Sequence, residues 1–201
     1  MRHHEGGDTT ADEPRVRILD AAEKLFYDRG IQAVGMAELR TEADVSLKRL
    51  YACFPSKNDL IAASLDRRDT RWRTALAAHV TEHATTPEGR LSAVFDWLYT
   101  WFATPDFRGC AFINSFGELG ATSDAVTAVA RRHKQALLDY LTDLARDLGA
   151  REPAVLGAQL ALLVNGAITA AAISGSPGAA REAHGAAQAL TATACRAPGN
   201  P

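Results

Sequence analysis

A short run of basic and aromatic side chains, between positions 46 and 57, carries the groups best suited to binding another molecule. It holds three cations, Lys48, Arg49 and Lys57, and no acidic residue, in a chain whose formal net charge is -2. Lysine and arginine bind phosphates, and arginine can form two hydrogen bonds to the O6 and N7 edge of guanine. Tyr51 lies beside these cations in the sequence. The run therefore indicates contact with a nucleic acid.

Two short helices are predicted around these side chains, at 36–43 and 46–54, with a two-residue break between them and Pro55 after the second. A helix-turn-helix of this layout places its second helix in the DNA major groove. Ser46 can cap that helix, because its hydroxyl can accept a backbone N–H of the first turn. Leu47 then faces outward together with the adjacent cations.

The inward faces of the two helices are apolar. Leu39 and Ala43 share a face of the first helix, and Leu50 and Phe54 lie four residues apart on the second. This spacing predicts a small core behind the basic surface. A solvated basic turn of an ordinary helical protein is the alternative interpretation.

The region around this motif resembles the DNA-binding domain of the tetracycline-repressor (TetR/AcrR) family of bacterial regulators. The matching features are a first helix, RVRILDAAEKLFYDRG, ending at Gly30, then the DVS turn, the helix LKRLYACF and the segment PSKNDL. The resemblance covers residues 14–65. It implies that Tyr51 and Lys57 contact phosphates, and that residues 46–49 contact bases or backbone.

Two positions depart from the family pattern. Gly35 stands where the family commonly has a threonine that caps the first short helix and touches phosphate. Lys48 stands where a glycine often opens the recognition helix. We therefore expect a different operator preference, in which Lys48 and Arg49 carry more of the contact.

The fold predicted for the chain is all-α, with no alternating apolar run that suggests a strand. We expect a mobile N-terminal tail at 1–13, a three-helix helix-turn-helix head at 14–60, and a helical ligand-binding and dimerisation body at 61–201. A helix at about 57–79 would join the head to the body.

The C-terminal part of the chain is rich in small residues. No charged residue occurs from 153 to 180, and the sequence contains two Ala-rich helical stretches, 153–175 and 177–197. The resemblance implies that these two helices pair with their copies in a homodimer. An intramolecular core and a membrane span are the alternatives, but polar Gln159 and Asn165 interrupt the first stretch.

The middle of the chain concentrates aromatic residues, which together with a few polar groups can line a pocket for a drug-sized molecule. The resemblance places an effector cavity in the body. Our candidate ligand-binding residues are Trp97, Trp101, Phe112, Asn114, Phe116, Glu118 and Asn165. Simple filling of the core is the alternative for the aromatic side chains.

Cys110 is a candidate redox-responsive residue. It lies beside Arg108 and near the start of a predicted helix, and both features favour the thiolate. Some relatives with a similar Gly-Cys motif sense electrophiles in this way. The alternative is a buried, inert cysteine. The odd cysteine count, three, argues against a disulfide framework and fits a reducing cytoplasm.

Patterns typical of enzymes are missing from the sequence: it has no HExxH pair, no GxSxG elbow and no phosphate-binding glycine loop. We expect no catalytic activity, no cofactor, no metal site and no membrane partner. The sequence indicates a cytoplasmic transcriptional repressor that binds a palindromic operator on double-stranded DNA as a homodimer and is released by a small-molecule effector. The rival is a ligand-binding protein with little DNA affinity, an alternative that the departure at Gly35 leaves open.

Overall fold

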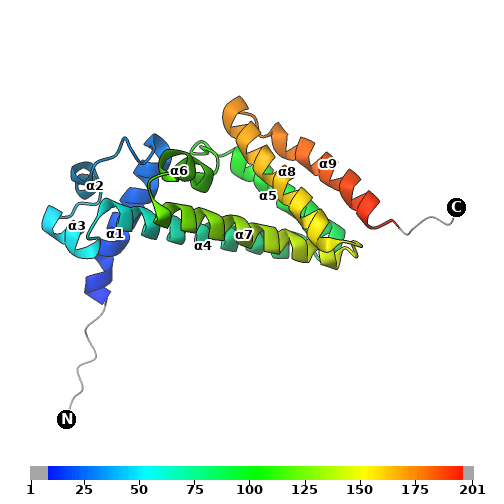
Figure 1. Ribbon diagram of the computed structural model, residues 1–201, viewed down its shortest axis with the longest axis horizontal. Helices are drawn as coiled ribbons and strands as arrows, with labels where there is room; N and C mark the ends of the chain where they lie inside the picture. The colour runs from blue at the N-terminus through cyan, green and yellow to red at the C-terminus, as the bar shows by residue number, and fades with distance from the viewer. Residues whose placement is uncertain (1–8, 197–201) are drawn as a thin grey trace, which may run out of the picture. The chain divides into compact units, whose positions relative to one another are not determined.

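The structure of the protein is a computed structural model that describes residues 9–196. Within that range the regular elements are helices, without any strand. Figure 1 labels them in chain order: α1 (Thr9–Arg29), α2 (Met36–Glu42), α3 (Leu47–Cys53), α4 (Lys57–His83), α5 (Pro87–Phe102), α6 (Ala111–Leu119), α7 (Asp124–Asp147), α8 (Pro153–Ser174) and α9 (Gly178–Ala194). The predicted all-α fold is confirmed.

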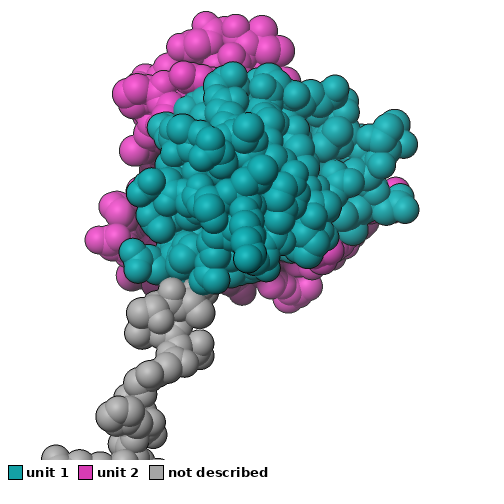
Figure 2. Space-filling model, turned by 90° about the vertical axis from the view of Figure 1, so that its left-hand side faces the viewer, with its two compact units in different colours: residues 1–69, 111–130 teal, residues 70–110, 131–201 magenta. Residues whose placement is uncertain are grey.

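The chain forms two compact units, which Figure 2 colours separately. The first unit comprises residues 1–69 and 111–130, and the second comprises residues 70–110 and 131–201. Helices α4 and α7 contribute residues to both units, whereas α6 belongs wholly to the first. This division differs from a single boundary after residue 60, because α6 returns to the N-terminal helices.

Helix α1 begins earlier than the sequence suggests. It starts at Thr9, so residues 9–13, which we assigned to a mobile tail, are helical and Pro14 lies inside the helix. Proline has no backbone N–H, so the first turns form with one internal hydrogen bond fewer. The rest of the predicted tail, residues 1–8, lies outside the described residues. At the other end Gly30 has a φ of 83°, the left-handed conformation expected of a helix cap.

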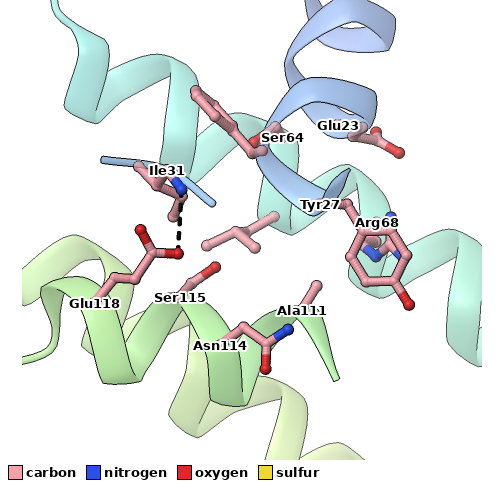
Figure 3. Close-up of a pocket in the computed structure, with 11 residues that line it drawn as sticks. Glu23, Tyr27, Ile31, Ser64, Arg68, Ala111, Asn114, Ser115 and Glu118 are labelled. Atoms are coloured by element: carbon pink, nitrogen blue, oxygen red, sulfur yellow. Dashed lines mark hydrogen bonds between the residues drawn. The ribbon is translucent and has the colours of Figure 1, made fainter. Parts of the chain in front are cut away.

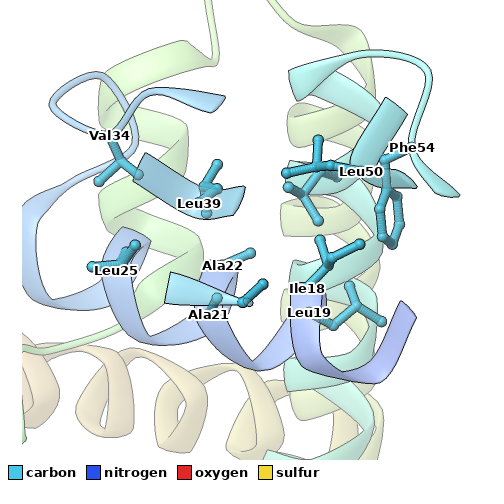
Figure 4. Close-up of a cluster of buried hydrophobic side chains, with 11 residues drawn as sticks. Ile18, Leu19, Ala21, Ala22, Leu25, Val34, Leu39, Leu50 and Phe54 are labelled. Carbon is cyan, nitrogen blue, oxygen red and sulfur yellow. The ribbon is translucent and has the colours of Figure 1, made fainter. Parts of the chain in front are cut away.

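The core of the first unit joins α1 to the two short helices (Figure 4). Ile18 of α1, Leu39 of α2 and Leu50 of α3 are all completely buried. Seven-residue helices are marginal by themselves, so α2 and α3 depend on this packing. The inward faces predicted from the spacing are confirmed. The cluster consists of Ile18, Leu19, Ala21, Ala22, Leu25, Val34, Leu39, Ala43, Leu50, Phe54 and Leu60.

The second unit is built around α5, α8 and α9, with α9 packed against both of the others. Helix α8 has an 18-residue window of mean hydropathy 1.7, so by length and composition it could cross a membrane. A core helix of a globular protein passes the same test, and α8 buries Leu160, Val164 and Ile168 within this unit. Gly157 brings α8 close to α7, because a Cβ there would lie 2.7 Å from the Cα of Thr142.

Candidate functional site

The basic run lies on a helix-turn-helix in the first unit. Helix α2 ends at Glu42 and α3 begins at Leu47, close to the predicted boundaries. Asp44 in the turn has a φ of 49°, a left-handed conformation that aspartate tolerates better than most residues. The hydroxyl of Ser46 accepts the backbone N–H of Arg49 at 3.1 Å, so the predicted N-cap is confirmed.

Helix α3 presents one apolar face to the core and a basic face to solvent. Leu50 is completely buried, whereas Leu47 is 44% and Tyr51 45% exposed. Lys48 and Arg49 are exposed beside them, and α3 carries no acidic residue. Exposed cations next to an exposed tyrosine on a capped helix are the groups that contact phosphates and base edges.

Gly35 precedes α2 as its N-cap, and no side chain caps this helix. A Cβ built on Gly35 would meet no atom within 4 Å. The position therefore has room for the threonine that the family commonly has there. The carboxylate of Glu38, in the first turn of α2, pairs with Arg29 of α1 and so helps to hold the helix.

Lys57 was expected to contact phosphate, but in the structure its ammonium is engaged within the first unit. Its Nζ donates a hydrogen bond to the carbonyl of Ile31 at 2.6 Å and lies 5.9 Å from the ring centroid of Phe26. An ammonium has three N–H donors, so this hydrogen bond and a contact with phosphate are compatible. In this structure Lys57 therefore positions the segment that leads into α2.

Glu118, one of the candidate ligand residues, also holds that segment (Figure 3). Its two carboxylate oxygens accept the backbone N–H groups of Ile31 at 3.1 Å and Gln32 at 2.9 Å. The Gln32 side chain donates in return to the backbone carbonyl of Glu118 at 3.1 Å. A Cβ at Gly30 would lie 3.1 Å from the same carboxylate, so the glycine permits the close approach. Helix α6 thereby fixes the connection between α1 and α2.

Arg15 supports the other end of the recognition helix, and nothing in the sequence singled it out. Its guanidinium donates to the carbonyl of Cys53 at 3.3 Å and lies 4.5 Å from the ring centroid of Phe54. A cation at the C-terminus of a helix satisfies a carbonyl and offsets the negative end of the helix dipole. Arg15 therefore helps to hold α3 in the position in which Lys48 and Arg49 of this helix are exposed.

The structure divides the seven candidate ligand residues between the two units. Phe112, Asn114, Phe116 and Glu118 belong to α6 in the first unit. Phe112 is buried there and Phe116 is 50% exposed. Asn114 and Glu118 border a small cavity, shown in Figure 3, whose volume of about 20 Å³ suits a single water. This cavity is too small for a drug-sized effector.

Trp97 and Trp101 lie in the second unit, and Trp72 joins them. The Trp72 ring meets Trp97 edge-on at 5.0 Å and Trp101 at 5.8 Å between centroids. The buried His133 packs against Trp72 at 5.2 Å. Beside Trp72, between α4 and α7, is a cavity of about 220 Å³ that is also lined by Leu137 and Tyr140. Burial raises the pKa of the Tyr140 phenol.

The seventh candidate, Asn165 of α8, belongs to a polar cluster in the second unit. Lys134 of α7 donates to the Asn165 side-chain oxygen at 2.6 Å and to the sulfur of Cys110 at 3.4 Å. Cys110 itself is 6% exposed. The Arg108 guanidinium, which we expected beside the thiol, donates to the backbone carbonyls of Pro105 and Phe107. The cation that meets the sulfur is thus Lys134.

Known proteins are similar to this chain in both sequence and fold. Residues 18–64 match the family model described as bacterial regulatory proteins of the tetR family. The activator FasR of Mycolicibacterium smegmatis is 34% identical over 143 residues, and the repressor ComR of Escherichia coli K12 is 31% identical over 121 residues. These matches cover 69% and 59% of this chain, but only 62% and 58% of the relatives' own lengths.

Solved structures extend the similarity over nearly the whole chain. The TetR-family regulator SCO4454 of Streptomyces coelicolor superposes with a TM-score of 0.82 at 29% identity, covering 92% of this chain and 97% of its own. A tetR-type regulator of Streptomyces avermitilis, sav143, superposes with a TM-score of 0.78 at 30% identity, covering 90% of this chain and 97% of its own. The chain therefore belongs to the TetR family of bacterial transcriptional regulators, whose members are not enzymes.

Proposed function

We propose that this regulator is a cytoplasmic, homodimeric repressor that binds a palindromic operator through α3 and leaves it when a small molecule binds the second unit. The exposed basic face of α3, capped at Ser46 and supported by Arg15, is the observation that carries the proposal. Two copies of such a helix, related by a two-fold axis, read two half-sites of opposite orientation.

Lys48 and Arg49 provide the most direct test of operator recognition. Replacing either one by alanine is expected to weaken specific binding by about 1 to 3 kcal/mol if the side chain contacts a base edge. Removing a residue that contacts only phosphate would instead weaken binding to all DNA sequences alike and would reduce the salt dependence of binding. The measurement is a titration of labelled operator and scrambled duplex at two salt concentrations.

Arg131→Ala is the matched control, since it removes an exposed cation from α7 instead of α3. If K48A, R49A and R131A bound the operator with the same affinity as the wild-type protein, the assignment of α3 as the reading helix would be wrong.

The exposed face of α8 supports the proposed homodimer through 153–175 and 177–197. Val155, Leu162 and Ile173 are 50%, 73% and 83% exposed, and they recur at helical spacing on an uncharged stretch. Exposed apolar surface of this kind is commonly covered by another chain. The small residues on the exposed side of α9, including Ala186 and Ala189, permit a close approach of helices.

Leu162→Glu is expected to convert the dimer to a monomer, because the carboxylate would be buried without a partner in the interface. Sedimentation velocity measures the change directly. Gln135→Glu adds the same charge on the exposed side of α7 and should remain dimeric. A monomeric wild-type protein would contradict the proposed homodimer, and a dimeric L162E variant would place the interface elsewhere.

The effector is proposed to bind beside the tryptophan cluster of the second unit. Trp72, which borders the 220 Å³ cavity, is a residue of α4, and the same helix begins at Lys57 in the first unit. A ligand that prefers one orientation of α4 would therefore shift the population between states with different operator affinity. Trp97, Trp101 and Asn165 remain the candidate contacts in this unit.

A second candidate function is an electrophile response through Cys110, which the hydrogen bond from Lys134 favours. The Lys134 ammonium lies 3.4 Å from the Cys110 sulfur, and reactive cysteines commonly have a cation beside the sulfur. With N-ethylmaleimide the sulfur would form a bond to one alkene carbon, the π bond would break, and a proton would be taken up at the neighbouring carbon. A bulky adduct at a buried position would then alter the packing of this unit.

Treatment with N-ethylmaleimide is expected to weaken operator binding by the wild-type protein by about tenfold, a typical coupling between two sites. Cys110→Ser should retain its affinity after the same treatment. Cys195→Ser is the control, because it removes an exposed thiol and should respond like the wild type. Equal inactivation of C110S and C195S would exclude Cys110 as the sensor.

A further inference from the structure

The groove between α5 and α9 in the second unit contains a second cavity, separate from the one beside Trp72. Its volume is about 400 Å³, within the range of small-molecule sites. Helix α5 contributes Glu88 and Ser92 to its lining, and α9 contributes His184, Gln188 and Thr191. The His184 ring stacks on Phe95 with 5.3 Å between centroids and 12° between planes, so its orientation is held by packing.

The hydrogen bonds around His184 indicate which ring nitrogen carries the proton. The hydroxyl of Ser92 donates to the carbonyl of Glu88 at 3.1 Å, so its oxygen is left to accept from His184 Nε2, which lies 3.1 Å away. Nε2 then carries the ring proton, and in the neutral ring Nδ1 is an acceptor. In this tautomer of the neutral ring, Nδ1 is free to accept a hydrogen bond from a bound group.

Other groups around this cavity can also accept hydrogen bonds, and the Thr191 hydroxyl and the Gln188 amide can donate as well. Glu88 supplies a carboxylate, and among the described residues it forms no ion pair. The hydroxyl oxygen of Thr191 is buried without a hydrogen-bond partner, an exception in folded proteins that a bound group often explains. No lysine or arginine is found among the described residues that border the cavity. Its apolar wall is formed by Leu91, Leu148 and Ala192.

We propose that this cavity binds a hydrophobic amine, whose ammonium group is held by Glu88 and the neighbouring acceptors and whose apolar part packs on the leucine side chains. An acceptor-rich site with one carboxylate and no cation favours a cationic donor over a neutral or anionic ligand. The α9 residues that line the cavity recur on a different side of the helix from the exposed Ala186 and Ala189. The site is therefore distinct from the proposed dimer surface.

Three fluorescent probes that share one apolar group test this proposal with the full-length protein. Dansylcadaverine carries an ammonium, dansylamide carries no charge, and dansylglycine carries a carboxylate. We expect saturable binding of dansylcadaverine, one molecule per chain, and weaker binding of the other two. Absence of dansylcadaverine binding, or equal affinity for the three probes, would overturn the proposal.

Variants locate the binding in this cavity. Glu88→Gln should weaken binding of dansylcadaverine by about five- to tenfold, the size of a lost charge-assisted contact, with little effect on dansylamide. Asp96→Asn, which removes another exposed carboxylate of α5, should leave both affinities unchanged. Ala192→Phe should fill the cavity and abolish binding of the ammonium probe. Binding that survives A192F, or an E88Q variant that behaves like D96N, would place the probe elsewhere and overturn the assignment.

Discussion

Leu50→Ala is expected to destabilise the DNA-binding unit by about 2 to 5 kcal/mol, the usual cost of removing a fully buried leucine side chain. Leu50 is completely buried in the cluster shown in Figure 4, where it joins α3 to α1. A small domain has only about 5 to 15 kcal/mol of stability, so this loss removes a large part of it. Because α3 is held by packing, operator binding should fall with the stability.

Urea unfolding followed by circular dichroism measures this loss. The matched control is Leu47→Ala on the same helix, whose side chain is 44% exposed and whose removal should cost much less stability. Comparable loss of stability in L47A and L50A would mean that the inward and outward faces of α3 are wrongly assigned.

Removing the Glu118 carboxylate is expected to have the second-largest effect. In Glu118→Ala the backbone N–H groups of Ile31 and Gln32 lose their acceptors, at a cost of about 1 to 3 kcal/mol. The segment that leads into α2 should then become more mobile, and operator affinity should decrease without any change to the basic face of α3. Glu118→Gln keeps one acceptor and should show a smaller effect.

Hydrogen exchange at the Ile31 and Gln32 amides, combined with operator titration, measures both consequences. Asp124→Ala, which removes an exposed carboxylate at the start of α7, serves as the control. If the two amides were equally protected in E118A and in the wild type, Glu118 would not be the residue that holds this segment.

The helix-turn-helix could be predicted from the sequence because its determinants are local. The spacing of Leu39 and Ala43, and that of Leu50 and Phe54, marks a buried face on each short helix. Ser46 and Gly30 mark helix ends by their own conformational preferences. A short-range pattern of this kind predicts the same helix in any fold that buries its apolar face. For the same reason the adjacent exposed cations could be recognised before the fold was known.

The backbone contacts of Lys57 and Glu118 could not be predicted, because their partners are distant in sequence. Glu118 accepts hydrogen bonds from residues 86 and 87 positions away, and Lys57 donates to a carbonyl 26 positions away. Their charge suggested contacts with DNA or a ligand, and the fold also gives them backbone partners within the first unit. The spacing of residues along the sequence does not predict hydrogen bonds between residues so far apart.

The aromatic residues illustrate a second limit. Because aromatic residues are frequent in the middle of the sequence, Trp97 and Trp101 were grouped with Phe112 and Phe116 in one candidate pocket. The structure assigns the two phenylalanines to a different unit from the tryptophans. Trp72 meets both tryptophans but lies about one helix earlier in the chain, outside the aromatic segment. Neighbours in sequence are not neighbours in space once a helix ends, and the turn after α5 separates the two groups.

Binding of the purified protein to the intergenic DNA upstream of its own gene tests the central claim most directly. The titration uses that DNA and a scrambled duplex at two salt concentrations. A sequence-specific regulator is expected to bind one dimer per site with a Kd of about 10⁻⁸ M or tighter, and to discriminate strongly against the scrambled duplex. Weak binding that is equal on both duplexes and lost with modest salt would contradict operator recognition, and a ligand-binding role without DNA affinity would then be favoured.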